Sequence, residues 1–134
     1  MKSQSITIPG QPVPQKRHRS VRVGGGLRTY DPSAAEKRRF ADLAIADGLL
    51  TWRGPLHVQL EFGMSRPKAH FRKGILRENA PSLPTGRPDL DNLVKFVLDA
   101  LNSLAWPDDS AIVSLHATKI YLSEPQTYLK ITQK

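Results

Sequence analysis

The chain has 134 residues, 39% of them hydrophobic, and its 20 Lys and Arg outnumber 12 Asp and Glu to give a net charge of +8. This length suits one compact domain with its own core, and the basic excess favours nucleic acid or an anionic membrane surface as partner. Cysteine is absent, which excludes disulfides and thiolate metal sites. No apolar run reaches the roughly 18 residues of a membrane span, and the opening segment lacks the apolar stretch of a secretory signal. We therefore expect a soluble cytoplasmic protein without a membrane partner.

The first part of the chain predicts a strand, a hairpin and a helix. Residues 3–8 alternate around Ile6 and Ile8 and end at a Pro-Gly pair, which is typical of a short strand. Two short segments, 21–23 and 27–30, flank three glycines and suit a loose hairpin. Asp31 and the proline after it indicate an N-cap and first helical turn, and the helix should run to about residue 46 and stop at a glycine.

The second half predicts a strand, a long loop, a helix and two more strands. Residues 56–64 alternate between apolar and polar, as a half-buried strand does. Residues 65–87 form a long basic loop, and loops of this length tend to be functional or disordered. A helix at about 89–104 and strands at 111–122 and 127–132 follow. We expect a single α+β domain over residues 1–134, with a mixed β-sheet packed by two main helices.

The helix that begins near residue 89 carries the most informative residues. At 100° per residue, one apolar stripe should face the core: Leu90, Leu93, Val94, Val97, Leu98 and Leu101. Phe96 lies opposite this stripe, and an exposed aromatic there indicates a dimer contact. Asp89 suits the N-cap, so that its carboxylate and that of Asp91 should project from the same helix end, with Lys95 one turn further on.

These acids have a structural and a functional interpretation. In the structural one, Asp89 caps the helix and Asp91 pairs with Lys95. In the functional one, the strand after the helix brings back the acidic pair Asp108 and Asp109, provided that strand and helix are antiparallel. Two or three carboxylates would then converge, and such hard oxygen ligands suit Mg²⁺ or Mn²⁺.

The neighbours of these acids also have two interpretations each. Lys95 could polarise an attacking water or neutralise charge on a phosphate. Asp99 could be a fourth ligand, but we favour it as an ion-pair partner of Lys95.

The same residues carry a family resemblance. The pattern Asp-x-Asp-Asn-Leu-x-Lys spans residues 89–95, and Asp99-Ala100-Leu101 and Trp106-x-Asp108-Asp109 follow it. This resembles the RusA family of Holliday junction resolvases, which prophages often encode, although the basic loop is longer here. The resemblance implies a homodimeric, Mg²⁺-dependent endonuclease, with Mn²⁺ as substitute, that nicks opposed strands of a four-way DNA junction in recombination and repair. By position it implies Asp89, Asp91 and Asp109 as metal-binding catalytic acids and Lys95 as the catalytic lysine.

Two basic clusters are the candidates for gripping DNA phosphates, and the alternative is that they are merely solvated. The candidate residues are Lys16, Arg17, Arg19, Arg66, Lys68, Arg72, Lys73 and Arg77. A two-fold symmetric junction asks for two active sites and therefore for a C₂ dimer. The rival functions are a non-catalytic basic DNA-binding module and a nuclease that acts on branched DNA more broadly.

Overall fold

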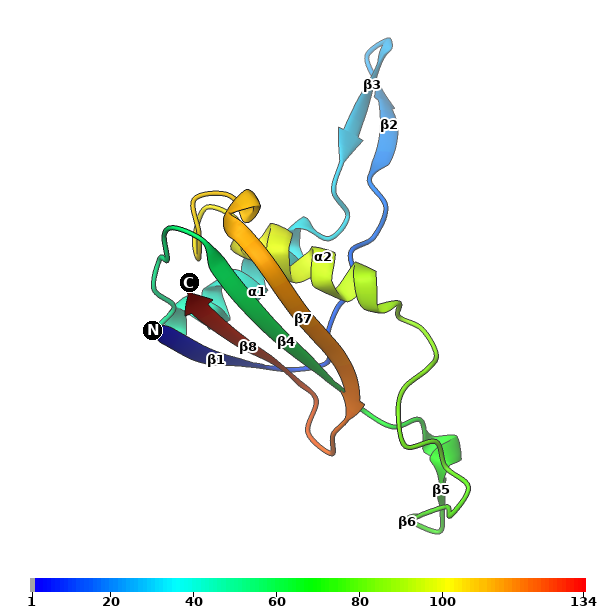
Figure 1. Ribbon diagram of the computed structural model, residues 1–134. Coiled ribbons are helices and arrows are strands. Elements are labelled where there is room, and N and C mark those ends of the chain that lie inside the picture. Colours follow the sequence, from blue (N-terminus) through cyan, green and yellow to red (C-terminus); the bar gives the residue numbers. More distant parts are fainter. Residues whose placement is uncertain (1) are drawn as a thin grey trace.

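A four-stranded sheet in the order β1-β8-β4-β7 forms the centre of the computed structural model, which describes residues 2–134 (Figure 1). The strands are β1 (Ser3–Pro9), β4 (Leu56–Met64), β7 (Ile112–Tyr121) and β8 (Gln126–Gln133). Strand β8 is antiparallel to both β1 and β4, whereas β7 runs parallel to β4. The predicted α+β class, with a mixed sheet and two helices in one domain, is confirmed.

Strand β4 lies inside the sheet because its sequence can bury one whole face. Leu56, Val58, Leu60 and Phe62 are buried, whereas the alternating residues between them are partly exposed. Helices α1 (Ala34–Ala46) and α2 (Leu90–Leu101) cover the buried face. Since β4 and β7 are parallel neighbours, the chain between them must cross over the sheet, and α2 is the helix of that crossover.

Helix α1 begins three residues later than Asp31, the predicted N-cap. The carboxylate of Asp31 accepts a hydrogen bond from the Ser33 backbone N–H at 2.8 Å, and its carbonyl oxygen accepts one from the Ala34 N–H at 3.2 Å. Asp31 therefore closes a turn ahead of the helix. The helix ends at Ala46, as predicted, and Gly48 follows with a φ of +94°, which glycine adopts readily.

Helix α2 buries a different set of side chains from the predicted stripe. Phe96 is only 2% exposed and packs edge-on against Phe40 of α1, with ring centroids 5.7 Å apart. Leu90, Val94 and Leu98 are only partly buried. The expectation of an exposed Phe96 at a dimer contact is wrong because α2 packs against α1 as well as the sheet, and a single-stripe pattern describes contact with one neighbour only.

The hairpin predicted around the glycines is present and stands out from the body of the protein (Figure 1). Strands β2 (Arg19–Val23) and β3 (Gly26–Tyr30) are antiparallel, and every residue in both is exposed. Gly24 and Gly25 form the two-residue turn, with φ values of +52° and +83°. Two positive φ values match the turn type that joins tightly twisted hairpins, which explains the glycine pair.

The basic loop 65–87 forms a second projection, away from the hairpin, and leads into the N-terminal end of α2 (Figure 1). It contains a short helix η1 (Lys68–His70) and a small hairpin of β5 (Phe71–Arg72) and β6 (Ile75–Leu76). Arg66 holds its base: the guanidinium lies 4.3 Å from the Tyr121 ring centroid and donates to the Pro81 carbonyl oxygen at 2.7 Å. This guanidinium thus joins the loop to β7, whereas the other Lys and Arg residues of the loop are exposed.

Candidate active site

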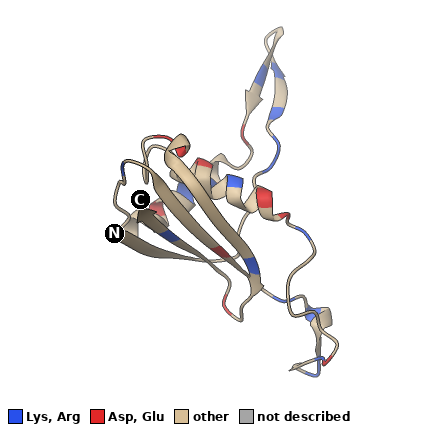
Figure 2. Ribbon diagram, in the orientation of Figure 1, with Lys and Arg blue, Asp and Glu red and all other residues tan. Residues whose placement is uncertain are grey.

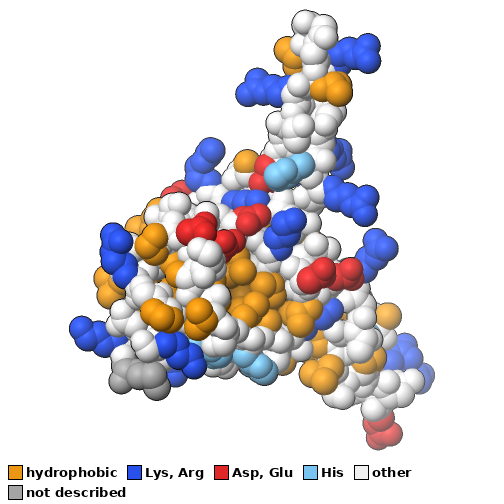
Figure 3. Space-filling view, turned by 45° about the horizontal axis from the view of Figure 1, so that its top comes forward, with side chains coloured by type: hydrophobic (Ala, Val, Ile, Leu, Met, Phe, Trp, Pro, Cys, Tyr) orange, Lys and Arg blue, Asp and Glu red, His pale blue; other side chains and the backbone are white. Residues whose placement is uncertain are grey.

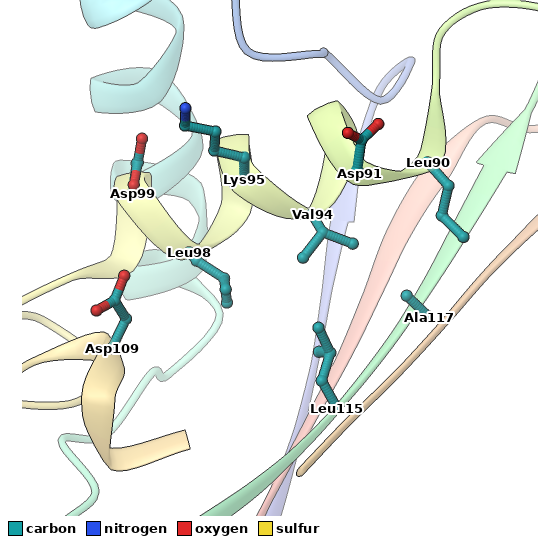
Figure 4. A pocket seen from close by; sticks show the side chains of 9 residues that line it. All are labelled: Leu90, Asp91, Val94, Lys95, Leu98, Asp99, Asp109, Leu115 and Ala117. Atoms are coloured by element: carbon teal, nitrogen blue, oxygen red, sulfur yellow. The ribbon is translucent and has the colours of Figure 1, made fainter. Parts of the chain in front are cut away.

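An open pocket of about 660 Å³ lies between α2, strand β7 and the short helix η2 (Asp109–Ala111) (Figure 4). Its polar residues are Asp91, Lys95 and Asp99 on α2 and Asp109 on η2. Its apolar residues are Leu90, Val94, Leu98, Leu115 and Ala117. Three carboxylates and one ammonium group therefore share a wall with a strip of aliphatic side chains.

Lys95 is exposed and forms none of the ion pairs found among residues 2–134. Asp91, one turn earlier, is also exposed, and its carboxylate accepts a hydrogen bond from the Asn92 backbone N–H at 3.0 Å. The structural interpretation, in which Asp91 and Lys95 pair with each other, is therefore not realised. The ammonium group of Lys95 remains available to an anion that enters the pocket.

Asp99 has a different partner from the predicted Lys95. Its carboxylate lies 3.4 Å from the Lys37 Nζ, and the same Nζ donates to Asp31 at 2.6 Å. Lys37 lies on α1, which packs beside α2, so this ion pair depends on helix packing rather than on spacing along one helix. The preference for a Lys95–Asp99 pair is thus wrong.

Strand β7 runs antiparallel to α2, and the contacts at both of its ends show this direction. Near its start, the Asp109 backbone N–H donates to the Asn102 side-chain oxygen at 3.0 Å, just after α2 ends. Near its end, the Lys119 ammonium donates to the carbonyl oxygens of Gly86 and Pro88 at 2.9 and 3.0 Å, just before α2 begins. Asp109 is consequently placed beside the second half of α2.

This direction separates the carboxylates that we expected to converge. Figure 4 shows Asp109 near Asp99, with Asp91 at the opposite end of the pocket. Asp91 and Asp99 are eight residues apart, which is about 12 Å along a helix axis. Within residues 2–134, no three His, Cys, Asp or Glu side chains are placed so that they could hold one metal ion. The expected convergence within one chain is wrong, because an antiparallel strand begins beside the C-terminal end of the helix, not its N-terminal end.

Asp89 occupies the N-cap of α2, as predicted, with an extended backbone. Its backbone carbonyl accepts from the Leu93 N–H at 3.2 Å, but its side chain makes no capping hydrogen bond. The residue lines another pocket, together with Arg17 and Arg87. Asp89 and Asp91 therefore belong to the same end of the helix but to different hollows of the surface.

Asp108 serves the turn before β7. Its carboxylate accepts a hydrogen bond from the Ser110 backbone N–H at 3.3 Å. Hydrogen bonds from Ser110 lower the pKa of the Asp108 carboxyl below its ordinary value. The acidic pair thus divides its roles: Asp108 shapes the turn, and Asp109 lines the pocket.

The sequence predicts no specific role for Lys119 or Lys37, the two lysines that link separate segments around the pocket. Lys119 ties β7 to the segment before Asp89, and Lys37 joins Asp99 to Asp31. Both act between segments that are distant in the chain. No local pattern marks such a lysine among the 20 basic residues.

Basic residues are found on two segments that flank the elements of this pocket, the β2–β3 hairpin and loop 65–87 (Figure 2). Lys and Arg occur along the β2–β3 hairpin and along loop 65–87, and Asp and Glu gather on α2 and η2 between them. A basic α+β domain with two basic segments beside an acidic pocket has the charge distribution of a protein that binds nucleic acid.

Comparison with known proteins shows the family to which the chain belongs. Residues 9–132 match the model of the family "Endodeoxyribonuclease RusA", and the chain belongs to that family. It is therefore a nuclease domain of an endodeoxyribonuclease family whose substrate is branched DNA. The chain is also 31% identical, over an alignment of 142 residues, to "Uncharacterized protein YqaN" of Bacillus subtilis (strain 168). That alignment covers 96% of this chain and 94% of the relative.

Among the described residues, none of the helices has the length and apolar character needed to cross a membrane.

Proposed function

We propose that the protein is a Mg²⁺-dependent endonuclease that resolves four-way DNA junctions by paired nicks, in recombination and repair. The observation that carries the proposal is that, in a member of this family, one pocket is lined by Asp91, Asp109 and a Lys95 that forms no ion pair with the described residues. The basic segments on either side supply the means to hold the phosphate backbone. In a water-excluded complex with DNA, the Lys95 ammonium would neutralise charge that develops on the attacked phosphate.

The side chains present suit Mg²⁺ in chemistry. Mg²⁺ binds oxygen ligands and is commonly held by one or two carboxylates, with waters and substrate phosphates completing the shell. Asp91 and Asp109 offer such oxygens, and Asp89 lies at the same helix end as Asp91. When bound, the metal would supply charge stabilisation and an activated water. Mn²⁺ has the same ligand preference and would substitute.

A homodimer would bring these acids together. Leu90, Val94 and Leu98 form an apolar strip on the pocket wall, and Leu115 across from it is 43% exposed. A two-fold axis through the middle of this strip would pair two α2 helices in antiparallel fashion. The first half of one helix would then face the second half of the other, and the partner's Asp109 would approach Asp91. The same symmetry would match the two-fold symmetry of a four-way junction.

The test of the activity is nicking of a synthetic four-way junction in Mg²⁺. We expect paired nicks from the wild type and a loss of at least about 100-fold in Asp91→Asn and in Lys95→Met, with junction binding retained. If the wild type binds but does not nick in Mg²⁺ or Mn²⁺, the protein is a non-catalytic DNA-binding module. Equal nicking of junction, fork and duplex would instead identify a nuclease of broader range.

The shared site has its own test in mixed dimers. Asp91→Asn and Asp109→Asn are each expected to be inactive, and mixing them lets subunits exchange. If each site takes Asp91 from one chain and Asp109 from the other, a mixed dimer contains one intact site and nicks one strand. If each site lies within one chain, every site in the mixture lacks one acid and no activity returns.

A further inference from the structure

The β2–β3 hairpin leaves apolar side chains without a partner. Val21 and Val23 on β2 are about half exposed, and Leu27 on β3 is 75% exposed. A lone two-stranded hairpin is at best marginally stable in water. Apolar side chains that stay in contact with water add no hydrophobic free energy to its stability. In the space-filling view the projection carries hydrophobic and basic side chains together along its length (Figure 3). Its composition therefore points to an occupant outside the chain's own core.

The charge of this hairpin and its entry indicates what the occupant is. Residues 16–30 contain five Lys and Arg and no Asp or Glu: Lys16, Arg17, Arg19, Arg22 and Arg28. The strand register places Arg28 directly across from Val21, and Arg22 directly across from Leu27. Residues paired in this way lie on the same face of the ribbon, so Val21 and Leu27 each have a guanidinium beside them, on opposite faces of the hairpin. This combination suits a ligand that presents phosphates next to apolar base faces.

We propose, on the basis of the proposed function, that the hairpin enters the branch point of the DNA and lays Leu27 and Val21 against unstacked base faces there. Base faces are buried by stacking in a continuous duplex and become accessible where strands exchange. Aliphatic side chains that insert between base steps are a known means of opening the stack, and Arg beside them holds the adjoining phosphates. The β2–β3 hairpin, here called the probe, thus recognises the branch point. The other basic residues bind the phosphate backbone of branched and unbranched DNA alike.

The base of the hairpin is anchored to the body of the protein. Gln15, which is nine-tenths buried, donates from its backbone N–H to the Asn92 carbonyl oxygen at 2.9 Å and from its side chain to Asp31 at 3.1 Å. The Lys16 N–H donates to the hydroxyl of the buried Ser33 at 3.2 Å. The two ends of the hairpin are thereby bound to each other, and the first end is also bound to α2.

The anchor continues to the pocket. Asp31 at the end of the hairpin is held by Lys37, and Lys37 also holds Asp99 on the pocket wall. The position of the hairpin's base relative to Asp91 and Lys95 is therefore set by the fold. A probe seated in the branch point would place the phosphates a fixed distance away over the pocket, so that the branch would determine where the strands are cut.

A second copy of the chain is the rival occupant, since its acidic pocket could receive a basic arm. The net charge of +8 on each copy disfavours arm exchange at low salt, and residues 16–30 carry five of the 20 Lys and Arg. DNA satisfies both the apolar and the basic side chains, so it is the occupant that we assign. Arm exchange is an outcome that the experiment below detects.

The experiment uses the full chain, a four-way junction with 2-aminopurine at the branch point and a matched duplex, in buffer without divalent metal. The wild type should raise the 2-aminopurine fluorescence, because unstacking the base relieves its quenching. Leu27→Ser should remove most of that rise and reduce the preference for junction over duplex about tenfold, with the salt dependence unchanged. Arg22→Gln, directly across the ribbon, should keep the rise and weaken binding to both DNAs, with a salt slope about one unit smaller.

The opposite results would overturn the proposal. An equal fluorescence rise and an equal junction preference in Leu27→Ser and wild type would show that Leu27 does not meet the bases. A change of sedimentation from dimer to monomer in Leu27→Ser would assign the hairpin to a second copy. Because binding is measured without metal, a wild type that unstacks the branch point but never nicks would refute the nuclease function and leave the hairpin's role standing.

Discussion

Replacing Lys37 with methionine removes the ammonium group that joins two acids of different elements, and the cost can be worked out from the structure. The Lys37 side chain is only 13% exposed, and its Nζ lies 2.6 Å from Asp31 and 3.4 Å from Asp99. Methionine keeps the aliphatic stem, so the packing between the helices is largely preserved. The variant therefore measures the loss of one charge rather than the loss of a side chain.

The pKa of Asp31 gives the magnitude. Burial raises the pKa of the Asp31 carboxyl, but hydrogen bonds from Lys37, the Ser33 backbone and Gln15 outweigh burial and lower it from 3.8 to about 2. A fall of that size corresponds to about 2.4 kcal/mol. This is an upper bound for Lys37, because the Asp31 side chain is still 21% exposed to screening solvent and shares its hydrogen bonds among three donors. We expect Lys37→Met to lower the free energy of unfolding by about 1 kcal/mol.

The same carboxyl makes stability depend on pH in acid. Its pKa is lower in the folded than in the unfolded state, so its contribution is fully present above about pH 4. The contribution is lost as the pH falls through about 2, where the folded carboxyl takes up a proton. Without Lys37 the pKa is depressed less, and the variant should lose less stability than the wild type between these two values.

Urea unfolding at about pH 7 and about pH 3 measures both effects through the midpoint at constant slope. Lys16→Met is the matched control: its pair with Glu36 spans 3.6 Å between two half-exposed side chains and should cost no more than about 0.5 kcal/mol. Equal stability of Lys37→Met and wild type would refute the stabilising role of the Lys37 ammonium between Asp31 and Asp99. An equal loss of unfolding free energy in Lys37→Met and Lys16→Met would show that a buried ion pair contributes no more to stability than an exposed one.

Three further changes probe other parts of the molecule. In Gly63→Ala, the added Cβ would meet the Leu122 side chain and lie 3.2 Å from the Gln126 carbonyl oxygen, so thermal unfolding should reveal a loss of about 1–3 kcal/mol. Trp106 is fully buried, and Trp106→Ala should cost about 3–5 kcal/mol in urea unfolding; a smaller loss would contradict its place in the core. Lys119→Met frees the segment before Asp89, and junction nicking should slow about tenfold or more while circular dichroism stays unchanged.

Much of the local structure could be predicted from the sequence because short-range patterns determine it. The alternation of residues 56–64 gave strand β4 with its bounds, and the paired glycines between residues 23 and 26 gave the hairpin. Asp89 was placed correctly at the start of α2 from its position before an apolar helix. Each of these features depends on neighbours within a few residues, where backbone preference and side-chain period act directly.

The relations between elements could not be predicted in the same way. Phe96 is buried because α1 packs beside α2, and the helical pattern of α2 alone contains no information about that neighbour. The direction of β7 decided that Asp109 lies near Asp99 and away from Asp91. The number of residues between α2 and Asp109 is compatible with Asp109 beside either end of α2, so the sequence did not decide between them.

The sequence by itself therefore determined which chemical groups the protein has: acids and a lysine in one motif, two basic segments and the elements that carry them. Only the tertiary structure decided which of those groups share a pocket, which lysine holds Asp99, and which residues anchor the hairpin. The reason is physical. Composition and period act along the chain, whereas a pocket is formed by packing between segments that the chain order does not bring together.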